Sequence, residues 1–576
     1  MLNSTLKSLL TVALVGMAGS AMAADNAPVF DWANYLQSSG GTIMESIAAG
    51  KNGSSYWMGA ATTNGDAVTL NGEALFTGET KVGTASTNNF VLFKAAADGS
   101  MMWNIHSTSG DFTPTKMAAV VESGDNVYFA TTVRQYTADV KSNLVDSKGT
   151  VTEFGDPVAN VADRYYTGIV VSATKDGVIN WITTINGPEG EKDVLATQGL
   201  AVAEDGTIVL VGQASKALTI GDATLTPAAE KQAYVMLLDK DGKYVSHFMP
   251  TGTTLGASSF TYAYAEGDDI YFAGKVEPDA EALTLTFGGK EFTTGTTHSA
   301  FAAKASATSL KDGKFDWLTC FVTDPMADGK YTFIDGKTVP GVDCVWFTAQ
   351  FKGSITMNGK TVASTQSAQN EGLLIKMTAE GAFVNGTVSR VDFTDAYICG
   401  YEGVLQTQAD KAYVYGYGMN AEVGIFLREY DAETLAPNKD ADWSLASFNG
   451  MPTGNIYAYN KEEGTLFAYT RPNKPVSAMG VEQTQTITNW TSFCGKYTLP
   501  EALKSGVENV AAVADAITVK AVAGGLEVAA PEATVVAVYD LAGRVVAVVS
   551  VSADAPATVA LPAGLYFAAG AKVAVY

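Results

Sequence analysis

The sequence predicts an all-β protein, a seven-bladed β-propeller followed by a small C-terminal antiparallel β-sandwich. Three observations support this fold class. Gly, Tyr and Phe number 57, 25 and 25, and only 17% of residues are charged, a composition typical of short strands joined by tight turns. Two strand–turn–strand phrases recur along most of the chain. Near the C-terminus, Ala and Val become dominant and aromatic residues almost disappear.

The chain is expected to have four parts: a signal peptide (1–23), the propeller (24–498), a linker (499–513) and the sandwich (514–576). In the signal peptide, Lys7 precedes the apolar stretch LLTVALVGMAG, and the small-residue motif AMA predicts cleavage between Ala23 and Ala24. That stretch is shorter than the roughly 20 residues that span a bilayer, and no later run reaches this length. We therefore expect export and no transmembrane segment. No Cys precedes Cys320, which argues against a lipid anchor at the cleavage point.

The first recurring phrase is an apolar strand, an acidic-Gly turn and a strand that often begins with Trp. Such a phrase predicts a hairpin, because Gly permits the positive φ that a tight turn needs. The paired acids in some turns do not complete a calcium-loop pattern, so ordinary turns are expected. Copies lie at 90–105, 168–183, 234–248 and 301–319, with weaker ones at 373–387 and 425–445.

The second phrase is an alternating strand, a turn, and a strand of aromatic and β-branched residues that closes on Gly or Ala. Aromatic residues on both faces suit a sheet that lies between two neighbouring sheets. Seven such units, each with room for four strands, predict a propeller, in which blades repeat radially around a ring. The predicted turns are at Gly53, Gly124, Gly206, Gly267, Gly341, Asp410 and Gly464.

The ring needs a seam, and the N-terminal segment is the candidate to close it. The stretch VFDWANYL (29–36) nearly repeats KFDWLTCF (314–321), so it has the pattern of a blade strand. We expect 29–36 to add the missing strand to the last blade, beside the segment that ends in TNWTSFCGKYTLP. The alternative is that Trp32 lies in a strand of the first blade. Residues 30–498 resemble the secreted seven-bladed propeller repeats of bacteria.

Charge and cysteine spacing exclude several classes of function. The formal net charge of −23 argues against nucleic-acid binding, which needs an excess of Lys and Arg. Cys320, Cys344, Cys399 and Cys494 form no CxxC pair and no metal-ligand spacing, so no metal site is expected. A disulfide between Cys320 and Cys344 is possible in an oxidising compartment. We favour the alternative, in which the thiols stay free and pack as small hydrophobic groups.

No catalytic, cofactor-binding or ligand-binding residue can be assigned from the sequence. The three histidines, His106, His247 and His298, are scattered, and no G-x-S-x-G, P-loop or H-E-x-x-H motif occurs. The DG-to-Trp spacing faintly resembles quinoprotein repeats, but the adjacent Cys pair of many quinoprotein dehydrogenases is missing. No cofactor is therefore expected, and an enzyme is less expected than a binding protein.

The C-terminal residues predict seven short strands, and here the sequence resembles the C-terminal sorting domain of the type IX secretion system. The matching stretches are SGVENV (505–510), VYDLAGRVV (538–546), LPAGLYF (561–567) and AKVAVY (571–576). In LPAG, we expect Pro562 to end the preceding strand and Gly564 to allow an unusual backbone φ angle. The alternative is a plain adhesive sandwich. The motif residues are Asp540, Gly543, Arg544, Pro562, Gly564, Tyr566 and Lys572.

The resemblance implies that the protein passes through the periplasm of a Gram-negative bacterium and is delivered to the cell surface or secreted. Its partner in that step would be the secretion machinery. Proteins with such tails include proteases, glycan-degrading enzymes and adhesins, so the tail does not select a function. The preferred hypothesis is a binding or scaffold propeller for a protein or glycan. The alternative is an extracellular hydrolase or lyase of a polymer, with its site in the propeller funnel.

Overall fold

The computed structural model consists almost entirely of strands and divides into two compact units, residues 1–504 and 505–576. Most of the predicted linker, 499–513, lies outside the described residues. These are 27–78, 87–109, 111–112, 119–135, 141–155, 165–188, 191, 195–279, 281–324, 332–365, 370–389, 399–418, 424–448, 456–483, 485, 487, 489–500, 517–530, 534–539, 545–552, 555–568 and 571–575.

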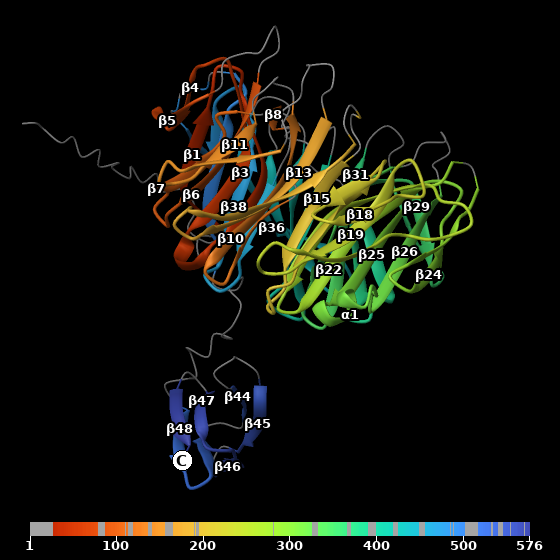
Figure 1. Cartoon of the computed structure of the whole chain (residues 1–576). Helices are drawn as coiled ribbons and strands as arrows, with labels where there is room; N and C mark the ends of the chain where they lie inside the picture. The colour runs from red at the N-terminus through yellow and green to blue at the C-terminus, as the bar shows by residue number, and fades with distance from the viewer. Residues whose placement is uncertain are drawn as a thin grey trace, which may run out of the picture. The chain divides into compact units, whose positions relative to one another are not determined.

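The first unit is a seven-bladed β-propeller, and each blade has four antiparallel strands (Figure 1). Blade 1 is β2 (Thr42–Ala49), β3 (Ser55–Thr63), β6 (Thr87–Ala95) and β7 (Met101–His106). Blade 2 is β9 (Ala119–Ser123), β10 (Asn126–Gln135), β13 (Tyr165–Thr174) and β14 (Ile179–Asn186). Blade 3 is β15 (Leu195–Val202), β16 (Ile208–Ala214), β19 (Gln232–Leu238) and β20 (Tyr244–Phe248).

The remaining blades have the same order. Blade 4 is β21 (Ala257–Glu266), β22 (Asp269–Glu277), β25 (Ser299–Ser306) and β26 (Trp317–Asp324). Blade 5 is β27 (Thr332–Pro340), β28 (Cys344–Lys352), β31 (Glu371–Thr378) and β32 (Phe383–Ser389). Blade 6 is β33 (Cys399–Leu405), β34 (Lys411–Gly418), β35 (Ile425–Asp431) and β36 (Pro437–Phe448). Blade 7 is β37 (Ile456–Asn460), β38 (Thr465–Thr470), β41 (Ser492–Thr498) and β1 (Val29–Gln37).

The ring is closed, and the first strand of every blade lies on its inside. Each first strand contacts the first strand of the next blade, from β2 through β9, β15, β21, β27 and β33 to β37, and β37 contacts β2 again. The second recurring phrase is the first two strands of each blade, and all seven predicted turns lie between them. The first phrase is the third and fourth strands. The predicted repeat is therefore confirmed.

The seam is also as predicted. Strand β1 is the outermost strand of blade 7 and pairs antiparallel with β41, with Val29 opposite Thr498 and Leu36 opposite Ser492. In Figure 1 this red strand lies beside the blue strands of the last blade. The alternative, that Trp32 belongs to the first blade, is wrong. Trp32 and Trp317 occupy equivalent fourth strands, which explains why the two quoted stretches resemble one another.

Six of the seven blades donate a hairpin to the preceding blade, and this hairpin joins the two blades. The hairpin comes from the connection between second and third strands and extends the outer edge of the preceding blade. Five hairpins pair directly with a fourth strand, and the sixth is joined through a Thr251–Thr286 bridge just beyond β20. In blade 6 this connection is only residues 419–424. The hairpins are β4 (Ala67–Leu70) with β5 (Glu73–Thr77), β11 (Ser142–Val145) with β12 (Val151–Phe154), β17 (Leu218–Ile220) with β18 (Ala223–Leu225), β23 (Thr284–Phe287) with β24 (Lys290–Thr293), β29 (Ser354–Met357) with β30 (Lys360–Ala363), and β39 (Val476–Ala478) with β40 (Val481–Glu482).

A second connection between blades explains the DG-to-Trp spacing. The Trp32 indole N–H donates to Ala97 O at 2.9 Å, and its ring packs on Gly99 in the turn of blade 1. Lys496 Nζ, on the adjacent strand of blade 7, donates to the same carbonyl at 3.0 Å. Trp103 of blade 1 contacts Lys175 O and Gly177 of blade 2 in the same way. The fourth strands of blades 7, 1 and 4 thus each supply a donor Trp to the turn of the next blade.

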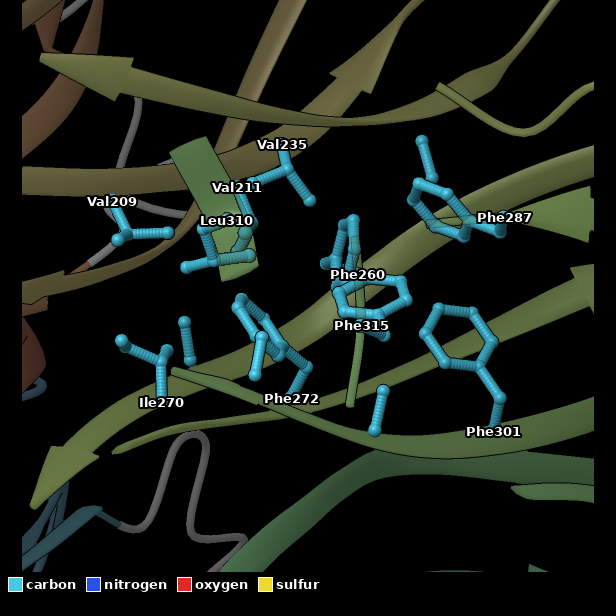
Figure 2. Close-up of a cluster of buried hydrophobic side chains, with 14 of the residues drawn as sticks. Val209, Val211, Val235, Phe260, Ile270, Phe272, Phe287, Phe301, Leu310 and Phe315 are labelled. Atoms are coloured by element: carbon cyan, nitrogen blue, oxygen red, sulfur yellow. The ribbon is translucent and has the colours of Figure 1, made fainter. Parts of the chain in front are cut away.

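The hydrophobic core is a series of layers between blades. The layer between blades 3 and 4 contains Phe260, Phe272, Phe287, Phe301 and Phe315, with the ring centroids of Phe287 and Phe315 5.1 Å apart (Figure 2). Burial of an aromatic side chain of this size contributes about 1.5–3 kcal/mol. The short helix α1 (Ala307–Lys311), which replaces a tight turn in blade 4, buries Leu310 in the same layer.

The second unit is a two-sheet antiparallel sandwich, as predicted. One sheet is β42 (Thr518–Val522), β43 (Gly525–Ala529) and β46 (Ala557–Ala560). The other is β45 (Val545–Val551), β44 (Thr534–Tyr539), β47 (Gly564–Ala568) and β48 (Ala571–Val575). The core between the sheets consists mainly of valine with Leu526 and Tyr566. All seven strands coincide with the predicted ones to within a few residues.

Cys320, Cys344 and Cys494 are free, so the possible bridge between Cys320 and Cys344 is not formed. Burial raises the pKa of the Cys344 thiol to about 11, so it stays protonated at neutral pH. The side chain of Cys399 lies outside the described residues. Among the described residues, no helix is long and apolar enough to cross a membrane.

Candidate ligand-binding channel

The first strands line the channel of the ring, and five of them carry a β-bulge near the same level. The register shifts between Met44 and Ser46, Thr197 and Gly199, Phe260 and Tyr262, Ile334 and Lys337, and Tyr401 and Gly403. A bulge adds an unpaired residue and re-aims the side chains beside it. The bulges therefore determine which polar side chains meet inside the ring.

Tyrosines from blades 4 and 6 meet in this channel. Tyr262 and Tyr264 lie on one face of β21, with parallel rings 6.4 Å apart. Tyr415 comes from the second strand of blade 6, and its hydroxyl lies over the first strand at a position where residue 403 is glycine. A Cβ at Gly403 would lie 2.2 Å from the Tyr415 hydroxyl. Tyr264 keeps 37% of its surface exposed, so solvent reaches the channel at this point.

An ion pair from two further strands completes the group. Lys337 Nζ of blade 5 is 2.6 Å from Glu402 Oε2 of blade 6, and it lies 5.7 Å from the centroid of the Tyr262 ring. The Lys337 and Glu402 side chains are only 17% and 10% exposed. We call Tyr262, Tyr264, Lys337, Glu402 and Tyr415 the channel cluster. Its two charges cancel, so the channel cluster is neutral overall.

The tyrosine hydroxyls of the channel cluster are donors at neutral pH. Burial raises the pKa of Tyr262, Tyr264 and Tyr415 well above the usual value. Nearby groups modify this effect: at Tyr262, Tyr415 raises the pKa and Lys337 lowers it. Within the described residues, no hydrogen bond occupies these three hydroxyls. The channel cluster therefore offers neutral O–H donors and aromatic faces to a ligand.

Near one end of the channel, an ion pair connects distant blades. Glu266 is the last residue of β21 in blade 4, and Lys461 follows β37 in blade 7. Lys461 Nζ binds Glu266 Oε1. Blades 4 and 7 are three places apart in a ring of seven, so this contact spans the channel.

The three histidines do not come together. His106 stacks on Phe76 with ring centroids 4.3 Å apart, and burial lowers its pKa to about 4. His247 Nδ1 is 2.7 Å from the Tyr244 hydroxyl in blade 3. His298 Nε2 is 3.9 Å from Glu277 Oε2 in blade 4. They belong to three different blades, so they cannot act together as a base and its partners.

Five carboxyl groups are unsuitable as general acids because their pKa values are lowered. The pKa values of Asp98, Asp205, Glu277, Glu429 and Asp431 are lowered, although burial opposes the shift at Asp205, Glu277 and Glu429. A general acid at neutral pH needs a raised pKa instead. The described residues contain no group of three or more His, Cys, Asp or Glu side chains placed to hold a metal ion.

The predicted sorting-motif residues are described only in part. Ala23, Ala24, Asp540, Gly543 and Arg544 lie outside the described residues, as does the side chain of Lys572. The Tyr566 hydroxyl donates to Pro562 O at 3.0 Å and closes the turn before β47. The expected unusual angle at Gly564 is wrong, because its φ is not positive. Glycine instead makes room for Tyr566, whose hydroxyl would lie 3.2 Å from a Cβ at this position.

Sequence reasoning missed the channel cluster. The stretch FTYAYAEG carries Tyr at alternate positions, which places both rings on one face of a strand. That signal could have identified Tyr262 and Tyr264. No local signal connects Lys337 with Glu402 or brings Tyr415 to the channel, because these contacts depend on ring closure and on the bulges.

No protein-family model matches the chain, and no curated protein matches its sequence. Among solved structures, an ulvan lyase from a polysaccharide lyase family is 10% identical with a TM-score of 0.41, covering 80% of this chain and 98% of that one. A europium-containing methanol dehydrogenase is 10% identical with a TM-score of 0.33, covering 82% and 93%. A neuraminidase-like protein from a little yellow-shouldered bat sample of Guatemala is 8% identical with a TM-score of 0.29, covering 58% and 91%. Likeness at this level says nothing about activity.

Proposed function

We propose that this protein is an exported binding propeller that holds a ligand in its central channel. The observation that carries the proposal is the channel cluster, which combines three protonated tyrosine hydroxyls with one ion pair and leaves the Tyr264 side chain exposed to solvent. Such a site binds through hydrogen bonds and aromatic contact. A glycan or a polar protein segment supplies matching acceptors.

Binding accounts for the channel cluster better than catalysis does. Hydrolysis or elimination in a polymer needs a general acid or base whose pKa lies near the working pH. The raised pKa values of Tyr262, Tyr264 and Tyr415 leave their hydroxyls protonated and therefore unsuitable as bases.

The sequence supports the delivery route. A signal peptide ending at Ala23 would take the chain to the periplasm, and the C-terminal sandwich would direct it to the cell surface or the medium through the type IX machinery. The sandwich has its own core, centred on Leu526 and Val538, as expected for an independent sorting module.

A binding array tests the proposed function. The chain from Ala24 to Tyr576 is applied to immobilised glycans and proteins, beside the double variant Tyr264→Phe/Tyr415→Phe. The matched control is Tyr539→Phe, which removes an equally exposed hydroxyl from the other unit. We expect a ligand that binds wild type and the control but loses affinity for the double variant. Binding that is the same for all three proteins would refute a site in the channel.

A further inference from the structure

We propose that the C-terminal sandwich pairs with a second copy of this chain through strand β45 (Val545–Val551), forming a symmetric dimer. This inference is independent of the channel cluster and concerns a surface that the proposed function does not use. Three features of β45 carry it: its place at the edge of a sheet, the lack of charge along it, and two exposed valines on its outer face.

Strand β45 is the end strand of its sheet, whose order is β45, β44, β47, β48 (Figure 1). One edge of β45 pairs with β44 over its whole length, from Val545 opposite Tyr539 to Val551 opposite Thr534. Within the described residues, no strand pairs with the other edge. That edge therefore presents a row of main-chain N–H and C=O groups to which another strand can bind.

The other three edge strands of the sandwich are protected against pairing, and β45 is not. Natural sheets protect their edges with lysine or with very short strands. Strand β42 carries Lys520, β48 carries Lys572, and β46 has only 4 residues. Strand β45, VVAVVSV, has 7 residues without a charge or a proline. Such a segment has a high tendency to pair with another strand.

Two exposed valines lie near the centre of β45. Val546 and Val548 are 43% and 61% exposed, whereas Val549, which faces the core, is buried. A neighbouring strand would cover part of both exposed side chains, because the Cβ atoms of directly opposed residues lie about 4.5–5.5 Å apart. The strand thus presents apolar side chains beside its free hydrogen-bonding edge.

The partner that suits β45 best is β45 of a second copy. An antiparallel pair of identical strands is related by a two-fold axis, the commonest symmetry of protein oligomers. Alignment over the whole strand places its central residue, Val548, opposite its own copy and Val546 opposite Ser550. No like charges meet in this pairing, and it occupies the free edge of both strands. The assembly therefore stops at two copies.

The size of the contact indicates a reversible dimer. A strand of this length extends for about 23 Å and offers one edge, so the contact is smaller than the roughly 1,200 Å² that stable interfaces bury. Main-chain hydrogen bonds supply the affinity in strand additions of this kind. We therefore expect a dimer that forms and dissociates with protein concentration.

Sedimentation velocity of the chain from Ala24 to Tyr576, over a range of protein concentrations, tests the inference. We expect a concentration-dependent dimer and no larger species. Val548→Lys should weaken the dimer about tenfold or more, because two ammonium groups would meet at the two-fold axis. The matched control is Val481→Lys, which places the same charge at a valine of the propeller that is 60% exposed, and it should leave the dimer unchanged.

A mixing experiment separates loss of the contact from loss of folding. Val548→Lys and Val548→Glu should each be mainly monomeric alone, and an equimolar mixture should restore the dimer, because opposite charges then face each other. Assembly beyond two copies, or a dimer that survives Val548→Lys, would overturn the inference. A wild-type chain that stays monomeric at every concentration would leave the edge to a different protein and overturn self-pairing. Failure of the mixture to pair, with both variants folded by circular dichroism, would do the same.

Discussion

The contact between Trp32 and Gly99 gives a sharp test of how the ring is fastened at its seam. Gly99 has φ +84°, and a Cβ added there would lie 2.8 Å from Trp32 Cδ2. The indole cannot easily move away, because its N–H donates to Ala97 O. The substitution Gly99→Ala therefore introduces both backbone strain and a clash with the seam strand.

The two costs can be separated with a second glycine. Alanine in the left-handed region costs roughly 1–2 kcal/mol. Overpacking against the indole adds about 1–3 kcal/mol. Gly72 has a similar φ of +87°, but nothing lies within 4 Å of a Cβ built there. We expect Gly72→Ala to lower the free energy of unfolding by about 1–2 kcal/mol and Gly99→Ala by about 2–5 kcal/mol.

Urea unfolding followed by tryptophan fluorescence measures this difference. All eight tryptophans precede residue 505, so the signal reports the propeller and not the second unit. The double variant Trp32→Leu/Gly99→Ala provides the control. Relative to Trp32→Leu, the alanine should then cost no more than it does at Gly72. Equal losses for Gly72→Ala and Gly99→Ala would refute the packing of Trp32 on the turn of blade 1.

Three further predictions concern pH, the channel and the tail. His106 has a folded pKa of about 4, below its ordinary value of 6.5, so its stabilising contribution is present above pH 6.5 and is lost as the pH falls toward 4. In urea titrations, His106→Phe should remove about 1–2 kcal/mol of that loss, and an unchanged pH profile would contradict burial of the neutral ring. Lys337→Met should destabilise the propeller by about 3–5 kcal/mol because Glu402 loses the Lys337 ammonium, whereas Lys337→Met/Glu402→Leu should recover most of it; equal losses would show that the pair is not coupled. Removal of residues 505–576 should leave a protease-resistant propeller that stays in the periplasm of a host with type IX machinery; surface delivery would refute the sorting role, and unfolding would make the tail structural.

The blade pattern could be predicted from the sequence because its signals are local. Six of the seven first turns contain Gly, which suits the backbone of a tight turn, and several fourth strands carry a Trp near their start. The seam could be predicted for the same reason, since residues 29–36 carry the pattern of a fourth strand. The pairing of Trp32 with Gly99 gives that pattern a physical cause.

The donated hairpins could not be predicted, because their partners lie in another blade. Strands β17 and β18 have three residues each, too few for alternation to reveal them. The channel cluster could not be predicted for a similar reason. Lys337 and Glu402 are 65 residues apart, and each lies beside a bulge that no local sequence pattern predicts.

Ring closure by β1 is the central structural claim, because a central channel exists only in a closed ring. Amide hydrogen exchange measured by mass spectrometry on the chain from Ala24 tests it directly. Peptides that cover Val29–Gln37 should exchange as slowly as those that cover Ser492–Thr498, the strand with which β1 pairs. Exchange of Val29–Gln37 at the rate of an unstructured peptide, with Ser492–Thr498 still protected, would contradict the closed seven-bladed ring.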